Sequence, residues 1–438
     1  MDEVLIDFSV ANFRSFQDEQ LFSMNAEGGP KRLQGNYSDI ENGRFSILRS
    51  AAIYGPNASG KSNLLKAFKA LSWLISNSKS LSEEDSIPAY EPFKLSSHFD
   101  TKEIEFKIEF IVPSGVRYEY SVSYTNKRVV SESLFAFPKR QRALIFKRDK
   151  LDTWETIKFG GSYKGGDRRF PFFPNSTYIS RAGNDASAPK SIREIVRYFR
   201  SIITLDAGVN IHLSNFYDQE GHLNTVSDLI CLADTGVKKI TAEESSPEGL
   251  RLPSDMPDFL KRVIIEQNSV SYKFWHEAQN GQLVKFEKEE MSDGTVKLFE
   301  ILPMLLMALS SGTPIFIDEL DGHLHTNIVS LIFELFNDPL ANSTDAQIIV
   351  TTHDTNLMDP NKLRRDQLWL VQKENGSSIL TSLDAYDKDS VRPNSPFEAF
   401  YKDGRFGALP SFSYVKIREA ITQMSIKSGY LKRNIDDA

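Results

Sequence analysis

The sequence contains Gly55-Pro56-Asn57-Ala58-Ser59-Gly60-Lys61-Ser62 between an apolar segment and a segment of helical periodicity. The apolar segment, residues 45–54, predicts a strand, and residues 62–75 predict a helix because their apolar positions recur at helical spacing. The eight residues have the Walker A spacing in the strand–loop–helix context that this motif requires. Glycines at its ends let the loop wrap closely, so that backbone N–H groups and the helix N-terminus face a phosphate. The stretch therefore predicts a phosphate-binding loop in an α/β protein.

The loop predicts a binding site for ATP and Mg²⁺. Lys61 is expected to reach the β- and γ-phosphates and to act in catalysis, and the Ser62 hydroxyl is expected to bind Mg²⁺, a hard cation that prefers oxygen ligands. The candidate nucleotide-binding positions are Gly55, Pro56, Asn57, Ala58, Ser59, Gly60, Lys61 and Ser62.

A second motif lies downstream, where an apolar strand ends in two carboxylates. Pro314-Ile315-Phe316-Ile317-Asp318-Glu319 has the Walker B form, in which the aspartate holds Mg²⁺. Glu319 follows the buried strand and is placed to accept a proton from an attacking water. We expect Asp318 to be a metal ligand and Glu319 to be the general base.

Two further segments complete the predicted site. Met291-Ser292-Asp293-Gly294-Thr295 precedes a helical run, with Ser292 in a favourable N-cap position, and a plain capped helix is one interpretation. Its place just upstream of Walker B resembles the ABC signature, which implies that Ser292 and Gly294 contact the γ-phosphate held by a second molecule. His353 follows an apolar strand and is expected to contact the γ-phosphate as a catalytic residue. His323 and His325 could mimic metal ligands, but their position assigns them to the loop after Walker B.

The rest of the chain organises around these motifs. Residues 4–24 predict antiparallel strands at a sheet edge, and period-two alternation over 104–158 predicts a β-meander. We expect residues 1–185 to form the N-terminal part of an ATPase head, residues 186–282 a helical insertion, and residues 283–438 the C-terminal part. No sustained heptads occur in the insertion, which argues against a coiled-coil arm.

Composition narrows the function classes. The chain has 438 residues, 40% of them apolar and 25% charged, which is typical of a folded globular protein. A net charge of −7 argues against a protein that coats nucleic acid, and a single cysteine, Cys231, cannot form an internal disulfide. The N-terminus has no basic–apolar export signal, and apolar runs such as 301–309 are shorter than the ~20 residues of a membrane span. We expect a cytoplasmic location without membrane association.

The motifs in this order, preceded by Asn12-Phe13-Arg14-Ser15-Phe16, resemble the SMC/RecF-like branch of the ABC ATPases over residues 1–75 and 285–375. Two shorter motifs, Ala233-Asp234-Thr235-Gly236-Val237 and the segment from Gly404 to Pro410, resemble compact AAA-type ATPases of bacterial phage-defence and abortive-infection systems. The resemblance implies an ABC-type P-loop NTPase head that hydrolyses ATP as a dimer or higher oligomer. In this family, Asp321 would be the D-loop residue at the dimer seam. Asp293 departs from the Leu-Ser-Gly-Gly form of transporters, and no Q-loop glutamine is identified.

Two biological roles follow from the resemblance. The first is a sensor or scaffold ATPase in anti-phage defence that controls an effector, with a nuclease as the leading class. The chain itself shows no nuclease motif, which implies that the effector is a separate protein. The second is a DNA repair or maintenance ATPase that clamps DNA between its heads, and a transporter ATPase ranks third. The sequence leaves nucleic-acid binding, the trigger and the oligomer size open.

Overall fold

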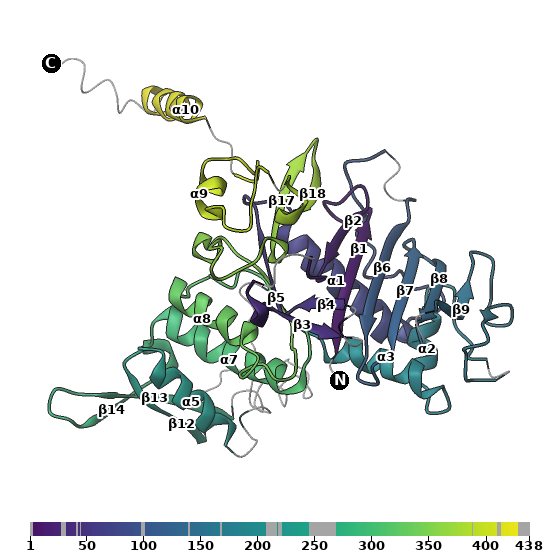
Figure 1. Ribbon diagram of the computed structural model, residues 1–438, viewed down its shortest axis with the longest axis horizontal. Helices are drawn as coiled ribbons and strands as arrows, with labels where there is room; N and C mark the ends of the chain where they lie inside the picture. The colour runs from purple at the N-terminus through teal and green to yellow at the C-terminus, as the bar shows by residue number, and fades with distance from the viewer. Residues whose placement is uncertain are drawn as a thin grey trace.

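The computed structural model describes residues 3–27, 32–40, 43, 45–97, 101–138, 141–166, 169–206, 217, 221–244, 269–387, 389–409 and 413–427. Two large sheets dominate the chain, an antiparallel one and a mainly parallel one (Figure 1). The helix that follows the phosphate-binding loop, α1 (Lys61–Asn77), lies between them. Phe68 of α1 contacts Phe8 of the first sheet edge-on at 5.3 Å and stacks on Phe316 of the second at 4.2 Å.

The antiparallel sheet has seven strands in the order β10-β9-β8-β7-β6-β1-β2. Residues 104–159 form a meander of consecutive antiparallel strands, which confirms the prediction from their alternation. Residues 4–24 also form antiparallel strands, with β2 at the edge and β1 paired with β6 on its other side. The strands are β1 (Val4–Ala11), β2 (Gln20–Ser23), β6 (Ile104–Ile111), β7 (Arg117–Tyr124), β8 (Val129–Ala136), β9 (Ala143–Arg148) and β10 (Lys158–Phe159).

The second sheet has six strands in the order β11-β15-β16-β5-β17-β18, parallel except for the β17–β18 hairpin. Its side chains alternate between two cores: Phe316 and Ile349 face the core around α1, whereas Ile317 and Val350 face the other. A sheet buried on both faces reads as continuous apolar runs, as the sequence shows. The strands are β5 (Ser50–Tyr54), β11 (Ile203–Leu205), β15 (Ile315–Ile317), β16 (Ile348–Thr351), β17 (Leu368–Glu374) and β18 (Ser377–Ser382).

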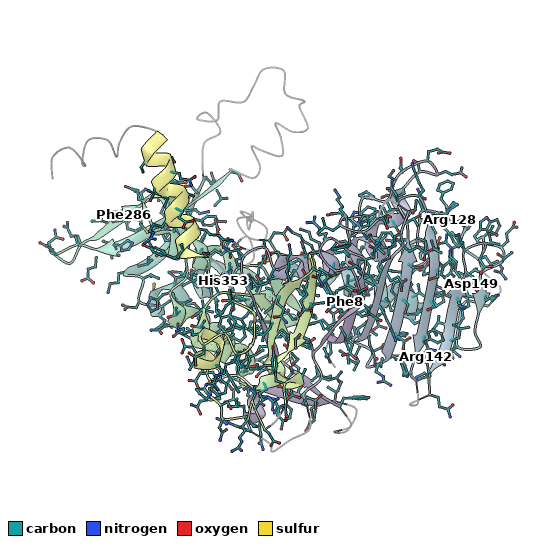
Figure 2. The ribbon with its side chains drawn as sticks, turned by 90° about the horizontal axis from the view of Figure 1, so that it is seen from above. Phe8, Arg128, Arg142, Asp149, Phe286 and His353 are labelled. Carbon is teal, nitrogen blue, oxygen red and sulfur yellow. The ribbon has the colours of Figure 1, made fainter. Side chains whose placement is uncertain are left out.

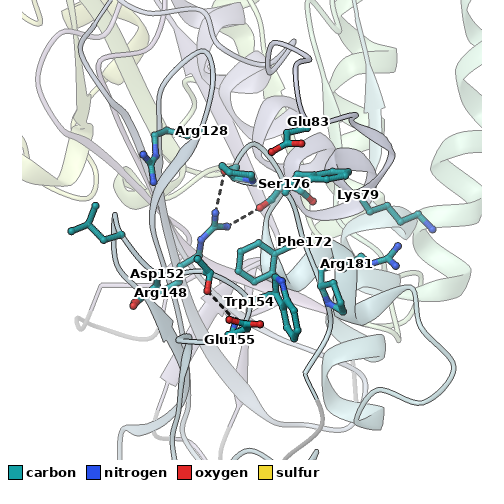
Figure 3. Close-up of a pocket in the computed structure, with 15 residues that line it drawn as sticks. Lys79, Glu83, Arg128, Arg148, Asp152, Trp154, Glu155, Phe172, Ser176 and Arg181 are labelled. Carbon is teal, nitrogen blue, oxygen red and sulfur yellow. Dashed lines mark hydrogen bonds between the residues drawn. The ribbon is translucent and has the colours of Figure 1, made fainter.

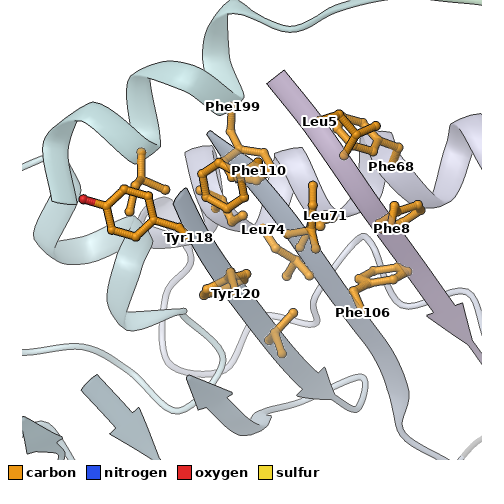
Figure 4. Packing of buried hydrophobic residues seen from close by; sticks show 14 of the residues in the cluster. Leu5, Phe8, Phe68, Leu71, Leu74, Phe106, Phe110, Tyr118, Tyr120 and Phe199 are labelled. Atoms are coloured by element: carbon orange, nitrogen blue, oxygen red, sulfur yellow. The ribbon is translucent and has the colours of Figure 1, made fainter. Parts of the chain in front are cut away.

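Helices α1 and α3 (Lys190–Ser201) pack side by side on one face of the antiparallel sheet. Figure 4 shows aromatic and leucine side chains of α1 and α3 packed against β1, β6 and β7. In that core Phe110 stacks on Tyr198 of α3 at 5.0 Å. The helices are α2 (Tyr178–Gly183), α3 (Lys190–Ser201), α5 (His222–Leu232), α7 (Asp293–Ser311), α8 (Thr326–Asn337), α9 (Phe397–Lys402) and α10 (Tyr414–Lys427).

The segment 186–282, expected to be a helical insertion, is only partly helical in its described residues. Helices α3 and α5 occur in it, but β11 joins the parallel sheet, and β12 (Val237–Glu244) and β13 (Val270–Glu277) form an antiparallel sheet with β14 (Leu283–Phe286). These strands are half exposed, so they lack the apolar alternation that predicts a strand. Residues 245–268 of the expected insertion lie outside the described residues. Figure 1 shows α5 and β12–β14 together at one end of the molecule.

Among the described helices, α7 alone has the length and apolar composition that could span a membrane. Its buried residues, including Leu298, Ile301 and Leu305, belong to the core that also contains β15 and β16. This packing is that of a core helix.

The remaining elements are short. They are the hairpin β3 (Tyr37–Ile40) and β4 (Phe45–Leu48) and the 3-10 turns η1 (Gln34–Asn36), η2 (Ser78–Ser80), η4 (Lys288–Glu290), η5 (Thr355–Leu357), η6 (Arg365–Gln367) and η7 (Leu383–Ala385). After α9 the chain turns at Gly404 and Gly407, both with positive φ, and packs through hydrogen bonds from Tyr386 to the Phe406 carbonyl and from Tyr401 to the Ala408 carbonyl. Pro410, the last residue of this predicted motif, lies outside the described residues.

Candidate nucleotide-binding site

The predicted site residues meet at the carboxyl edge of the parallel sheet. The phosphate-binding loop follows β5, Asp318 follows β15 and His353 follows β16, and these three strands are neighbours in the sheet. Side chains at the carboxyl ends of adjacent parallel strands form the usual ligand crevice of open α/β sheets. Figure 2 shows His353 near the middle of the molecule.

The backbone of the loop from Gly55 to Ser62 requires its glycines. Gly55 and Gly60 have φ angles of 151° and 114°, which side-chain-bearing residues rarely adopt. A Cβ on Gly55 would lie 2.2 Å from the Val371 carbonyl oxygen, and one on Gly60 would lie 2.3 Å from Ser378 Oγ. The loop is therefore held closely against β17 and β18. Ser59 Oγ is buried and has no hydrogen-bond partner among the described residues.

Lys61 occupies the position that a phosphate-binding lysine needs. Its Nζ donates hydrogen bonds to the carbonyl oxygens of Gly55 at 2.7 Å and Pro56 at 3.3 Å, so the ammonium group lies across the loop. Burial lowers the pKa of Lys61, while the negative charges of Glu319, Asp318 and Asp321 act in the opposite direction. An ammonium group held across the loop can donate charge-assisted hydrogen bonds to phosphate oxygens.

Ser62 and Asp318 come together as a pair of oxygen ligands. Ser62 Oγ donates to Asp318 Oδ1 at 2.9 Å, and Thr351 Oγ1 donates to the same oxygen at 2.6 Å. Asp318 is almost fully buried. A serine hydroxyl beside a carboxylate fits Mg²⁺, which takes few protein ligands and completes its shell with phosphate oxygens and water.

Glu319 differs from Asp318 in exposure and backbone conformation. It is exposed, has a φ of 52°, and its N–H donates to Thr351 Oγ1 at 2.8 Å. The left-handed conformation turns the chain at the end of β15, so the two neighbouring carboxylates have separate environments. This arrangement leaves the Glu319 carboxylate open to a water molecule.

His353 and Asp321 connect the two strand ends. The His353 N–H donates to Asp321 Oδ2 at 3.0 Å. Burial and then the charge of Lys61 lower the pKa of the His353 imidazole, while Asp321 and Glu319 act to raise it. At neutral pH the lowered pKa favours the neutral imidazole, which can donate one hydrogen bond to a phosphate.

Ser292 and Gly294 lie at the N-terminus of α7 and serve their own helix in the single chain. Ser292 is the N-cap residue, and its Oγ accepts from the Thr295 N–H at 3.2 Å. Gly294 packs against the loop after Walker B, because a Cβ there would lie 2.8 Å from the His323 carbonyl oxygen. Within the described residues no hydrogen bond joins Ser292 to the phosphate-binding loop, whereas the loop, Asp318, Glu319 and His353 are brought together.

The two histidines after Walker B have local roles. His325 caps α8, since its Nδ1 accepts from the Asn327 N–H at 3.2 Å. His323 Nδ1 lies 3.5 Å from Asp293 Oδ2, and both side chains are exposed. Within the described residues, no cluster of three or more histidine, cysteine or acidic side chains could hold a metal.

Sequence reasoning missed three residues that support the site. Thr351 contacts both Asp318 and Glu319, and its only sequence signal is its position before Thr352 and His353. Ser15 Oγ accepts from Asn63 Nδ2 at 2.8 Å, and its carbonyl accepts from the Ser378 N–H at 2.7 Å. Ser378 Oγ donates to the Ser59 carbonyl, so Ser15 and Ser378 hold the loop from outside.

Thr351→Val tests the metal ligand pair. Valine keeps the shape of threonine but removes the hydroxyl that holds Asp318, so we expect the Mg²⁺ concentration for half-maximal ATP hydrolysis to rise by about 10–100-fold. Titration of ATPase activity with Mg²⁺ measures this. Thr352→Val is the matched control, because Thr352 is equally buried but accepts from the Asp354 N–H instead. An unchanged Mg²⁺ requirement in Thr351→Val would contradict the assignment.

A phosphate-binding loop, a Walker B strand and a capped helix before it, set on this pair of sheets, define a P-loop ATPase of the ABC type. A family model described as "AAA domain, putative AbiEii toxin, Type IV TA system" matches residues 50–359, and the chain belongs to this family. No curated protein matches the chain.

Solved structures similar to the chain include an SMC head bound to the C-winged helix domain of ScpA, with 14% identity and a TM-score of 0.42, covering 88% of this chain and 99% of that one. The SMC head domain from Thermotoga maritima has 14% identity and a TM-score of 0.38, covering 86% and 98%. The recombination mediator RecF with bound ATPrS has 12% identity and a TM-score of 0.37, covering 87% and 99%.

Proposed function

We propose that the chain binds ATP with Mg²⁺ and hydrolyses it to ADP and phosphate. The observation that carries this proposal is the meeting of Lys61, the Ser62–Asp318 pair and the exposed Glu319 carboxylate at one sheet edge. Lys61 and the loop N–H groups hold the phosphates, and Ser62 and Asp318 hold Mg²⁺, which supplies charge neutralisation at the phosphates when bound. Glu319 accepts the proton of the attacking water, and His353 donates to the γ-phosphate.

The complete site needs a second copy of the chain. Ser292 is exposed at the N-terminus of a 19-residue helix, where backbone N–H groups and the helix dipole favour an anion. Among the described residues Ser292 hydrogen-bonds only within its own helix, so we assign its phosphate contact to the nucleotide of a partner copy. Asp321, which holds the His353 backbone, would lie at the seam between the two copies.

For the biological role we propose a sensor or scaffold ATPase of a defence system that controls a separate effector. The family description, "AAA domain, putative AbiEii toxin, Type IV TA system", supports a defence role. The sequence shows Walker A, signature, Walker B and switch-histidine motifs but no nuclease motif, so a destructive activity would come from a partner. ATP can shift such an assembly only through different affinities for its two arrangements.

Retention of a partner tests this role. We expect the tagged chain to co-purify with the product of an adjacent gene and to hold it differently when hydrolysis is blocked. The measurement compares the partner bound by wild-type, Lys61→Ala and Glu319→Gln proteins with and without ATP, and Glu84→Gln, an exposed glutamate outside the site, is the control. Identical retention in all conditions would remove the ATP switch. Tight ATP-dependent DNA binding with no partner would favour a DNA-clamping ATPase instead.

A further inference from the structure

A cavity of about 570 Å³ opens in the part of the molecule built on the antiparallel sheet, which we call the antiparallel lobe, away from the site described above. Its walls come from η2 after α1, from the turn before β8, from the end of β9, from the loops 151–155 and 171–176, and from α2. The volume lies within the range of small-molecule pockets, about 300–1,000 Å³. Figure 3 shows Arg148 among the lining residues, with its hydrogen bonds to the 174–176 backbone.

The buried floor of the cavity is a preorganised arginine. Arg148 is 1% exposed, its Nη1 donates to the Ser176 carbonyl at 2.7 Å and its Nη2 to the Pro174 carbonyl at 3.0 Å. Phe172 packs on the guanidinium at 4.2 Å, and Arg148 Nε is buried without a partner among the described residues. Glu132 lies 3.8 Å away behind it and balances the buried charge.

The walls combine aromatic faces with cations. Trp154 and Phe173 are 36% and 46% exposed, although large aromatic side chains gain stability from burial. Lys79, Arg128 and Arg181 also line the cavity, and in the described part of the chain none of the three forms a salt bridge. Three carboxylate side chains also line the cavity: Glu83, Asp152 and Glu155.

One of these carboxylates is already engaged. Asp152 accepts from the Asp149 N–H at 2.7 Å and from the Thr156 hydroxyl at 3.2 Å, so it fixes its own loop. The lining therefore holds four cationic side chains, Lys79, Arg128, Arg148 and Arg181, beside three carboxylates, of which Asp152 is held by its own loop. Flat aromatic faces beside such cations select a ligand with a ring to stack and an anionic group to pair.

The cavity is separate from the ATP site. Lys61 begins α1 and Lys79 follows its end, so the 17-residue helix places the two about 25 Å apart. Figure 2 shows Arg128, which lines the cavity, far from His353. The cavity wall is nevertheless tied to the end of α1, because Thr177 Oγ1 donates to the Leu74 carbonyl at 3.1 Å and the Lys79 N–H donates to Ser180 Oγ at 3.1 Å.

We propose that this cavity binds one nucleotide unit, with its base against Trp154 and Phe173 and its phosphate beside Lys79 and Arg181. The unit is either a free nucleoside monophosphate or one nucleotide of a single strand, since both present the same base and phosphate. The cavity is too small for a duplex, whose major groove alone is about 12 Å wide.

Binding to the full-length chain with Lys61→Ala tests the proposal, because this variant removes the phosphate-binding lysine of the ATP site. The probes are AMP, GMP, CMP and UMP and a six-residue oligo-dT, measured by titration calorimetry. We expect binding that Trp154→Ala weakens by about tenfold or more through lost stacking. The double variant Lys79→Ala with Arg181→Ala should weaken it similarly, and Lys164→Ala, an exposed lysine of the same lobe outside the cavity, should not.

The calorimetry distinguishes a free nucleoside monophosphate from a nucleotide of a single strand. Binding of monophosphates alone identifies a free nucleotide, and tighter binding of the oligonucleotide identifies a single strand. Both support the proposal when the cavity variants weaken binding. No binding of any probe, or equal binding by the cavity variants and the parent protein, would overturn it. Failure of the ATPase proposal appears separately, as absent ATP binding by the chain with Lys61 intact.

Discussion

Glu319→Gln should leave ATP binding intact and slow hydrolysis by about 10²–10⁴-fold, the usual contribution of a general base. Glutamine keeps the size of glutamate but cannot accept a proton. The side chain is exposed, and the backbone of residue 319 is held by Thr351, so the substitution should not disturb the fold. Single-turnover hydrolysis and equilibrium binding of ATP measure the two effects separately.

Two further variants sharpen this result. Lys61→Ala should lose ATP binding itself, because its ammonium group is the cation that lies across the phosphate-binding loop. Glu84→Gln removes an exposed carboxylate that is not part of the candidate site, so this variant should bind and hydrolyse ATP as the wild type does. Hydrolysis by Glu319→Gln at the wild-type rate would contradict the assignment of Glu319 as the general base.

Ser292→Arg should abolish hydrolysis while the single chain still binds ATP. The arginine places a long side chain at the exposed N-terminus of α7, where a partner's γ-phosphate is expected to lie. The variant also loses the N-cap hydrogen bond of α7, which costs about 1 kcal/mol of stability, so thermal unfolding is measured beside activity. Ser114→Arg, at an exposed turn of the antiparallel lobe, is the control for a surface arginine. Full hydrolysis by Ser292→Arg would show that this surface does not approach the nucleotide.

Much of the site could be predicted because its residues lie in short motifs at strand ends. Lys61, Asp318 and His353 follow apolar runs, and parallel strands bring their carboxyl ends to one edge whatever the length of chain between them. The positions of Gly55 and Gly60 could be predicted for the same reason, since the loop conformation requires glycine. The β-meander followed from its alternation, which a sheet with a core face imposes.

The supporting residues could not be predicted, because their partners are distant in sequence. Ser378 contacts the Ser59 carbonyl across 319 residues, and nothing around Ser378 indicates a phosphate-binding loop. Strands β12–β14 were missed for another reason: at the periphery, with one face in solvent and charged side chains throughout, their sequence does not alternate clearly. The second cavity also has no motif, because its residues come from five separate segments.

The shared site is the central claim, and mixing two inactive proteins tests it most directly. In a dimer of one Lys61→Ala chain and one Ser292→Arg chain, both lesions fall in the same site and the other site is intact. After confirmed subunit exchange of an equal mixture, we expect hydrolysis to recover to about one quarter of the wild-type value, because half of the dimers carry one intact site each. No recovery despite exchange would contradict a site built from two copies of this chain.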